Sequence, residues 1–348
     1  MLPATPSASM RIPLVASFFF LALSALPLLA YTPHYTGSVI RLDAELDALV
    51  APEARPELLA TGLAWAEGPA WRKKGGYVVF SDIPKNTIYK WSESEGLSVF
   101  LRPAGYTESN PPPLGRELGT NALLWDHHGR LVMLDQGNRR VVRLDEKNYT
   151  KVVLADRYHG KRFNSPNDLA YHSNGDLYFT DPPYGLDGLD ANPHKELKFN
   201  GVYRLTAAGE LHLILSDLTR PNGIALSPDE KILYVCVSDP SDARVMAYDL
   251  RPDGTVENGR VFFDANALLK QAGGKGNPDG LKLDKQGNVF LGGPGGILVI
   301  TPQGKHLGTI VTGHVTANCA FGDDGSTLYI AADSTFLRIR LKTVGEGF

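Results

Sequence analysis

Residues 169–181 read LAYHSNGDLYFTD: a short apolar run, a polar turn with a glycine, and a second apolar run that ends in aspartate. Apolar runs of this length on either side of an Asn-Gly-Asp turn are typical of two antiparallel β-strands joined as a hairpin. The same unit recurs along the chain. Its copies span residues 69–82, 123–135, 169–181, 224–235, 281–291 and 319–330.

The copies follow one another at a nearly constant distance, on average about 50 residues. Several are followed by a third strand that carries an aromatic residue or an arginine, as at residues 88–91, 141–144, 201–205 and 336–340. Repeats of this length with several short strands each are typical of propeller blades. No amphipathic helix of 10 to 15 residues separates the strands, which argues against an α/β fold. The sequence therefore predicts an all-β fold, a six-bladed β-propeller over residues 61–348.

The first 60 residues lie outside this repeat. Arg11 precedes a largely apolar stretch that ends at Ala30, which predicts a signal peptide over residues 1–30, with an uncleaved signal anchor as the alternative. A signal peptide implies secretion or export to the periplasm. Residues 31–60 are expected to form an extension that packs on the propeller. No other stretch approaches the ~18 to 20 apolar residues of a membrane helix, so the mature chain is expected to have no membrane span.

The net charge bears on nucleic-acid binding, and the cysteines bear on whether disulfide bonds stabilise the fold. A formal net charge of −3 gives no electrostatic reason to expect nucleic-acid binding, which requires a basic face. Cys236 and Cys319 each lie inside an apolar strand, which predicts two buried thiols in preference to a disulfide. Nothing in the sequence indicates an oligomeric state.

One side chain with an oxygen donor stands at the start of each repeat's first strand. These residues are Glu67, Asn121, Asn167, Asn222, Asp279 and Asn318. Because the innermost strands of a propeller line its central channel, six equivalent positions form a ring of carboxylate and amide oxygens around the axis. The ring holds no histidine or cysteine, which argues against zinc, copper and haem iron. Calcium takes 6 to 8 oxygen ligands, so the ring predicts a calcium ion in the channel.

Two other recurring features have a less definite meaning. Aspartates close most of the second strands and are expected to be turn or inter-blade hydrogen-bond partners: Asp82, Asp135, Asp181, Asp239 and Asp333. Residues 102–119 and 184–200 are longer than a propeller turn needs. Such insertions are often functional, although a plain surface loop is an equal alternative.

The residues around the ring resemble those of a known family. The chain is similar to senescence marker protein (regucalcin), gluconolactonase and luciferin-regenerating enzyme, and its pattern is nearest to that of microbial gluconolactonases. The resemblance covers about residues 60–342. It is carried by EGPAW at 67–71, SPNDL at 165–169, RPNGI at 220–224, PDGL at 278–281, and the longer stretch 160–186.

The resemblance implies a role for particular residues. A divalent metal would be held by Glu67, Asn167, Asn222 and Asp279. Asp279 would also be the acid/base, while Asn121 and Arg162 would contact the substrate. Calcium is the expected ion, and zinc, magnesium and manganese are the other divalent candidates. The chain departs from the family pattern at Ala122, where glycine is usual.

The implied activity is hydrolysis of a small-molecule sugar lactone. The metal would polarise the lactone carbonyl and Asp279 would activate water, although Asp279 acting as the nucleophile is an open alternative. Two other functions fit the same architecture. One is an aryl- or phosphate-ester hydrolase in the manner of paraoxonases, and the other is a non-enzymatic calcium-binding propeller.

Overall fold

Antiparallel sheets of four or five strands follow one another along the chain. The structure is a computed structural model that describes residues 1, 32–108 and 115–348, so all but Met1 of the expected signal peptide lies outside the described residues. Residues 33–348 form one folded unit. In the described part of the chain, no helix is both long and apolar enough to span a membrane.

Blades 1 to 4 each use four consecutive strands, ordered from the centre outward. Blade 1 consists of β3 (Ala66–Arg72), β4 (Tyr77–Asp82), β5 (Thr87–Ser92) and β6 (Gly96–Leu101). Blade 2 consists of β7 (Leu123–Trp125), β8 (Leu131–Asp135), β9 (Arg140–Asp145) and β10 (Thr150–Ala155). Blade 3 consists of β13 (Leu169–Tyr171), β14 (Leu177–Asp181), β15 (Gly201–Leu205) and β16 (Leu211–Leu215). Blade 4 consists of β17 (Pro221–Leu226), β18 (Ile232–Val237), β19 (Arg244–Leu250) and β20 (Val256–Asp264).

Blades 5 and 6 each receive their outermost strand from the start of the folded unit. Blade 5 consists of β21 (Leu281–Leu283), β22 (Val289–Gly293), β23 (Gly296–Ile300), β24 (His306–Val311) and β1 (Ser38–Arg41). Blade 6 consists of β25 (Thr316–Gly322), β26 (Thr327–Ala332), β27 (Thr335–Arg340) and β2 (Glu57–Ala60). Residues 31–60, expected to be an extension packed on the propeller, thus supply strands that close the ring. Glu57 pairs with Arg338 in register, and the Arg338 Nε donates to the Glu57 carboxylate at 2.7 Å.

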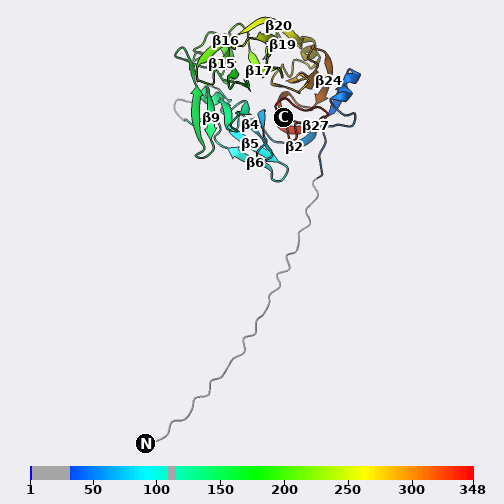
Figure 1. Cartoon of the computed structure of the whole chain (residues 1–348), viewed down its shortest axis with the longest axis horizontal. Helices are drawn as coiled ribbons and strands as arrows, with labels where there is room; N and C mark the ends of the chain where they lie inside the picture. The colour runs from blue at the N-terminus through cyan, green and yellow to red at the C-terminus, as the bar shows by residue number, and fades with distance from the viewer. Residues whose placement is uncertain (2–31, 109–114) are drawn as a thin grey trace. The chain divides into compact units, whose positions relative to one another are not determined.

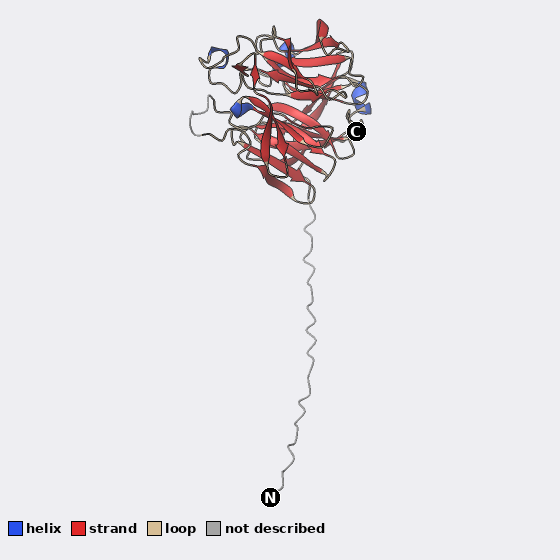
Figure 2. Ribbon diagram, turned by 60° about the vertical axis from the view of Figure 1, so that its left-hand side comes forward, coloured by secondary structure: helices blue, strands red, loops and turns tan. Residues whose placement is uncertain are grey.

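Few other elements occur among the described residues. They are η1 (Ala44–Ala48), η2 (Gln136–Asn138), η3 (Leu189–Ala191), the helix α1 (Asn266–Gln271), and a small sheet of β11 (Arg157–Tyr158) and β12 (Lys161–Arg162). The predicted six-bladed propeller is therefore confirmed (Figures 1 and 2). The first strand of each blade contacts the first strand of the next, in the closed order β3, β7, β13, β17, β21 and β25.

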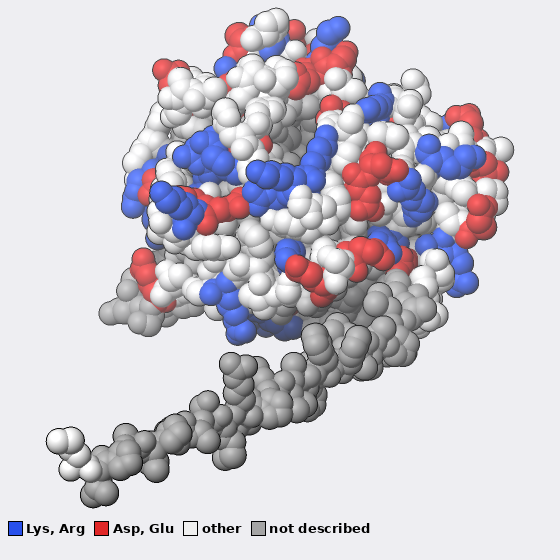
Figure 3. All heavy atoms as spheres, turned by 60° about the horizontal axis from the view of Figure 1, so that its bottom comes forward, with Lys and Arg blue, Asp and Glu red and all other residues white. Residues whose placement is uncertain are grey.

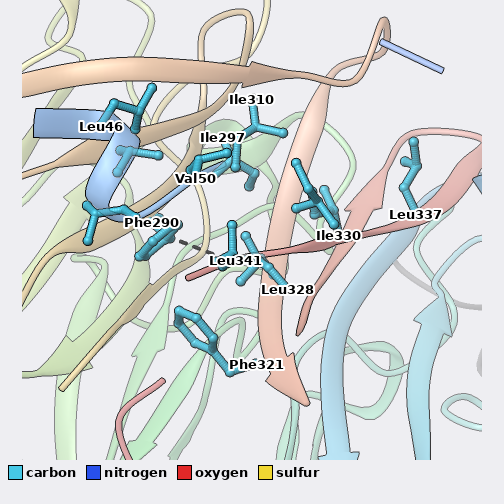
Figure 4. Packing of buried hydrophobic residues seen from close by; sticks show 14 of the residues in the cluster. Leu46, Val50, Phe290, Ile297, Ile310, Phe321, Leu328, Ile330, Leu337 and Leu341 are labelled. Atoms are coloured by element: carbon cyan, nitrogen blue, oxygen red, sulfur yellow. Dashed lines mark hydrogen bonds between the residues drawn. The ribbon is translucent and has the colours of Figure 1, made fainter. Parts of the chain in front are cut away.

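Buried apolar clusters lie between neighbouring blades, one for each of the six pairs. The strands of each blade are covered on both faces by the neighbouring blades. This burial explains continuous apolar runs such as Val78–Phe80. Figure 4 shows the cluster between blades 5 and 6, to which Leu46 of η1 and Val50, just after η1, also belong. Cys236 and Cys319 are buried, unpaired thiols in these layers, as predicted.

The surface carries charges of both signs close together. Figure 3 shows lysine and arginine side chains interspersed with acidic ones over the face that it draws. Several are paired, as in the contact of 2.5 Å between Arg340 of β27 and Asp324 in the turn between β25 and β26. Exposed pairs of this kind contribute little to stability, about 0 to 1 kcal/mol each. The stability of the fold therefore comes mainly from the layers between blades.

Candidate functional site

The ring residues meet around a cavity of about 280 Å³ at the end of the channel where the first strands begin. Five of the six predicted ring positions line it: Glu67, Asn121, Asn167, Asn222 and Asp279. The sixth, Asn318, is 2 % exposed and its Nδ2 donates to Oδ2 of Asp168 at 3.4 Å. The structure thus brings together the four residues predicted to hold a metal.

Glycines after the ring residues let neighbouring inner strands approach closely. A Cβ atom on Gly223 would lie 2.0 Å from the backbone oxygen of Asp279, and one on Gly280 would lie 2.0 Å from Cγ of Asn318. Each glycine that follows a ring residue therefore packs against the ring residue of the next blade. Any larger side chain would push these two ring positions apart.

The closing aspartates hold the loops that lead to the ring residues. Asp82 accepts hydrogen bonds from the backbone N–H groups of Ala64 and Trp65, at 3.0 and 3.2 Å, just before Glu67. Asp181 accepts hydrogen bonds from the N–H groups of Asn164 and Ser165, both at 2.8 Å, just before Asn167. These two aspartates are hydrogen-bond partners of turns, as predicted from their recurrence.

Two carboxylates share the buried end of the channel. Glu67 is 3 % exposed and its Oε2 accepts a hydrogen bond from the Gly68 N–H at 2.8 Å. Burial raises the pKa of Glu67 to about 8. Burial, followed by repulsion from Glu67, also raises the pKa of Asp279 well above its usual range. Two carboxylates so placed are costly to ionise together, and a bound cation would offset that cost.

Two amide oxygens in the cavity wall have no hydrogen-bond partner. They are the Oδ1 atoms of Asn222 and Asn277, both buried. Buried polar atoms are nearly always satisfied, so these acceptors indicate a missing donor or cation. Asn277 stands two residues before Asp279 and outside the ring register, so the repeat does not predict it as a site residue.

The amide of Asn121 is oriented by its neighbour. Its Nδ2 donates to Oε1 of Gln136 at 2.9 Å. This hydrogen bond fixes which side-chain atom of Asn121 is the donor and which, Oδ1, is the acceptor. Gln136 is 1 % exposed and its Nε2 donates in turn to Oε2 of Glu117. Asn121, Gln136 and Glu117 therefore form one hydrogen-bonded chain at the side of the cavity.

The two long insertions each place a side chain in the cavity wall. Glu117 belongs to the insertion at 102–119, and Tyr184 to the insertion at 184–200. The Tyr184 hydroxyl donates to the backbone oxygen of Ser238 at 2.8 Å. Arg220, directly before Pro221 in β17, lines the cavity as well. Sequence reasoning marked both insertions but selected none of these residues.

Arg162 lies elsewhere. It lines a neighbouring cavity of about 750 Å³ together with Arg139 and Lys195, and it is not among the residues that line the 280 Å³ cavity. Its guanidinium donates to the backbone oxygen of Asn138 at 2.7 Å. The structure therefore gives Arg162 a contact within the protein and separates it from the other predicted site residues.

Oxygen donors of mixed type characterise the site. The described residues contain no group of three or more His, Cys, Asp or Glu side chains placed to hold a metal. A cation here would be held by two carboxylates and by neutral amides. This donor set, with its unsatisfied amide oxygens, suits a hard divalent cation. Asp168, the residue after Asn167, is also buried, and Lys282 Nζ lies 4.0 Å from its Oδ2.

The family profile described as the SMP-30/Gluconolactonase/LRE-like region matches residues 65–334. The chain belongs to this family. The matched range starts just before Glu67 and ends inside the last blade, directly before β27, so it contains the whole ring of inner strands. The resemblance inferred from the motifs around the ring is thereby confirmed.

Among curated relatives, a gluconolactonase from Zymomonas mobilis is 41% identical over 311 residues, which cover 89% of this chain and 87% of that protein. A solved structure of a gluconolactonase from Xanthomonas campestris has a TM-score of 0.76 at 30% identity, covering 89% of this chain and 96% of that one. Regucalcin from Agrobacterium tumefaciens, described as a calcium-binding protein, has a TM-score of 0.65 at 19% identity over 84% of this chain and 94% of that one. At that identity the last likeness concerns the fold alone.

Proposed function

We propose that this member of the SMP-30/gluconolactonase family is a metal-dependent lactone hydrolase that acts on a sugar-type lactone. The observation that carries the proposal is the cavity in which Glu67, Asn167, Asn222 and Asp279 come together with an unsatisfied amide oxygen. The 41% identity to a gluconolactonase over nearly the full length of both chains supports the same activity.

The cation would be held by Glu67, Asn167, Asn222 and Asp279. We propose calcium, because the donors are carboxylate and amide oxygens, with zinc, magnesium and manganese as the divalent ions to compare with it. A bound divalent cation supplies Lewis-acid polarisation of a carbonyl oxygen. The negative charge of Glu67 and Asp279 is what such an ion would neutralise.

Asp279 is the proposed general base. Its carboxylate lines the cavity and is partly exposed to it, so it can reach a water beside a bound ligand. In the proposed reaction Asp279 takes a proton from the attacking water and returns it to the alkoxide released when the ring C–O bond breaks. In the alternative, Asp279 attacks the carbonyl itself. Heavy oxygen from labelled water would enter the Asp279 carboxylate in the second case and not in the first.

Asp279→Asn tests the assignment directly. We expect at least a roughly hundredfold loss of kcat for glucono-1,5-lactone, because amide nitrogen cannot take the proton. The measurement is acid release at constant pH, corrected for spontaneous hydrolysis. Asp217→Asn, at an exposed position of the outer surface, is the control and should retain full activity. Equal rates in Asp279→Asn and the unmodified chain would remove Asp279 from the mechanism.

The two other functions named from the sequence would give different results in the same experiment. A chain that hydrolyses aryl or phosphate esters and leaves lactones untouched would be the ester hydrolase. A chain that binds calcium but accelerates neither reaction would be the non-enzymatic binder.

A further inference from the structure

Glu117 is a third carboxylate in the wall of the cavity. It lines the same 280 Å³ space as Glu67 and Asp279, yet it comes from the insertion at 102–119 and not from the first strand of a blade. Glu117 lies close enough to the other two carboxylates for its charge to contribute to the raised pKa of both Glu67 and Asp279.

Glu117 does not form a three-carboxylate metal site with Glu67 and Asp279. Among the described residues, no three acidic, histidine or cysteine side chains are placed to bind one ion. Glu117 therefore lies near the proposed ion site without sharing an ion with both Glu67 and Asp279. A carboxylate that lines the cavity outside the proposed set of metal ligands is placed to contact a ligand bound beside the ion.

The orientation of Glu117 leaves acceptor capacity for a ligand. Gln136 donates to its Oε2, and Gln136 is itself held by Asn121 at 2.9 Å. Burial raises the pKa of Glu117 to about 7, so the carboxylate is ionised above neutral pH. An ionised carboxylate offers about four acceptor positions on two oxygens, so one donor leaves several unused. The hydrogen-bonded chain fixes the direction in which they point, and such fixed acceptors favour ligands with matching donors.

The charge that remains once an ion is bound bears on the class of ligand. The carboxylates Glu67, Glu117 and Asp279 line the cavity together with the guanidinium of Arg220. A divalent cation would neutralise Glu67 and Asp279, which leaves Glu117 as the carboxylate that a ligand would meet, and an anionic group placed beside Glu117 would be repelled. Neutral ligands rich in hydroxyl groups can donate to a carboxylate without that cost, and hydrogen bonds to a charged acceptor are the stronger kind.

We propose that Glu117 determines specificity: its carboxylate accepts hydrogen bonds from hydroxyl groups on the lactone ring and so selects neutral polyhydroxylated lactones. The kinetic test of this role rests on the proposed lactone hydrolysis, because it compares rates for two lactones. A site built to bond a hydroxyl discriminates against ligands that lack one, because its polar group is then left unpaired.

The test compares two lactones that differ in their hydroxyl groups, using the full chain with calcium added. For glucono-1,5-lactone, Glu117→Gln should raise KM and lower kcat/KM by roughly 10- to 100-fold. For δ-valerolactone, which lacks ring hydroxyls, the same variant should stay within about threefold of the unmodified chain. Glu117→Asp should restore part of the loss. Glu108→Gln, an exposed acid of the same insertion, is the matched control and should change neither substrate.

Binding of lactams separates this inference from the proposed activity. D-glucono-1,5-lactam and δ-valerolactam keep the ring but resist hydrolysis, and their Kd values can be measured by calorimetry. If the chain hydrolyses neither lactone but Glu117→Gln weakens only the hydroxylated lactam at least about tenfold, the activity is wrong and the recognition stands. Equal losses for both ring types, no loss for either, or no lactam binding by the unmodified chain would overturn the role of Glu117.

Discussion

At the residue scale, the unsatisfied oxygens of Asn222 and Asn277 are the features that the protein alone does not explain. An amide oxygen buried without a partner costs free energy, typically about 1 to 3 kcal/mol. In a cavity that also holds Glu67 and Asp279, a divalent cation would satisfy both the unpaired acceptors and the excess negative charge.

Replacing Asn222 tests this explanation. Asn222→Ala removes one oxygen donor, so we expect calcium to bind at least about tenfold more weakly. Isothermal titration calorimetry on the metal-stripped chain measures the change. Asn148→Ala, at an exposed turn, serves as the control. Unchanged calcium affinity in Asn222→Ala would mean that its oxygen does not contact the ion.

At the element scale, acidic side chains at strand ends organise the blades. Asp176, directly before β14, accepts hydrogen bonds from Arg204 Nε at 2.6 Å and from the Ala207 N–H at 3.0 Å. It therefore joins the second strand of blade 3 to β15 and to the turn that follows β15. Burial would raise the pKa of Asp176, but the Ala207 N–H and the Arg204 guanidinium lower it below its usual value.

The lowered pKa of Asp176 predicts how stability depends on pH. The unfolded chain binds a proton at Asp176 at a higher pH than the folded chain does, so this contribution is present above pH ~4 and is lost as the pH falls further. Asp176→Asn should reduce the free energy of unfolding by about 1 to 3 kcal/mol at pH 7. Urea denaturation of both chains at pH 7 and pH 3 measures the difference between them.

That difference should shrink at pH 3, because the unfolded form of the unmodified chain then binds a proton at Asp176 that folding must release. A difference that stayed constant between the two pH values would show that ionisation of Asp176 adds nothing to stability. Asp217→Asn is again the control, since Asp217 is exposed.

At the scale of the whole molecule, the repeat in the sequence accounts for most of the fold and for the ring of the site. Glu67, Asn167, Asn222 and Asp279 could be predicted because each stands at the same position of a repeat whose first strand lines the channel. The pairing of β2 with β27 could not be predicted, because Glu57 and Arg338 are separated by most of the chain and β2 pairs with neither β1 nor β3, its neighbours in sequence.

The remainder of the site comes from parts of the chain that do not repeat. Glu117 and Tyr184 lie in insertions, where no register relates a residue to the channel. The role of Arg162 as a substrate contact stays a prediction: its guanidinium donates to the backbone oxygen of Asn138 beside the 750 Å³ cavity, and Glu117 lines both that cavity and the 280 Å³ cavity. Periodicity predicts positions on strands, while loops are positioned by contacts that only the folded chain contains.

We propose above all that this propeller hydrolyses a lactone with the help of an ion held at its ring of oxygen donors. The most direct measurement strips the chain of metal with a chelator, verifies the metal content, and follows acid release from glucono-1,5-lactone as calcium is added back. We expect the rate to fall to that of spontaneous hydrolysis and to return to its full value at about one equivalent of ion. Full activity in the metal-stripped chain, or no recovery with calcium, zinc, magnesium or manganese, would contradict it.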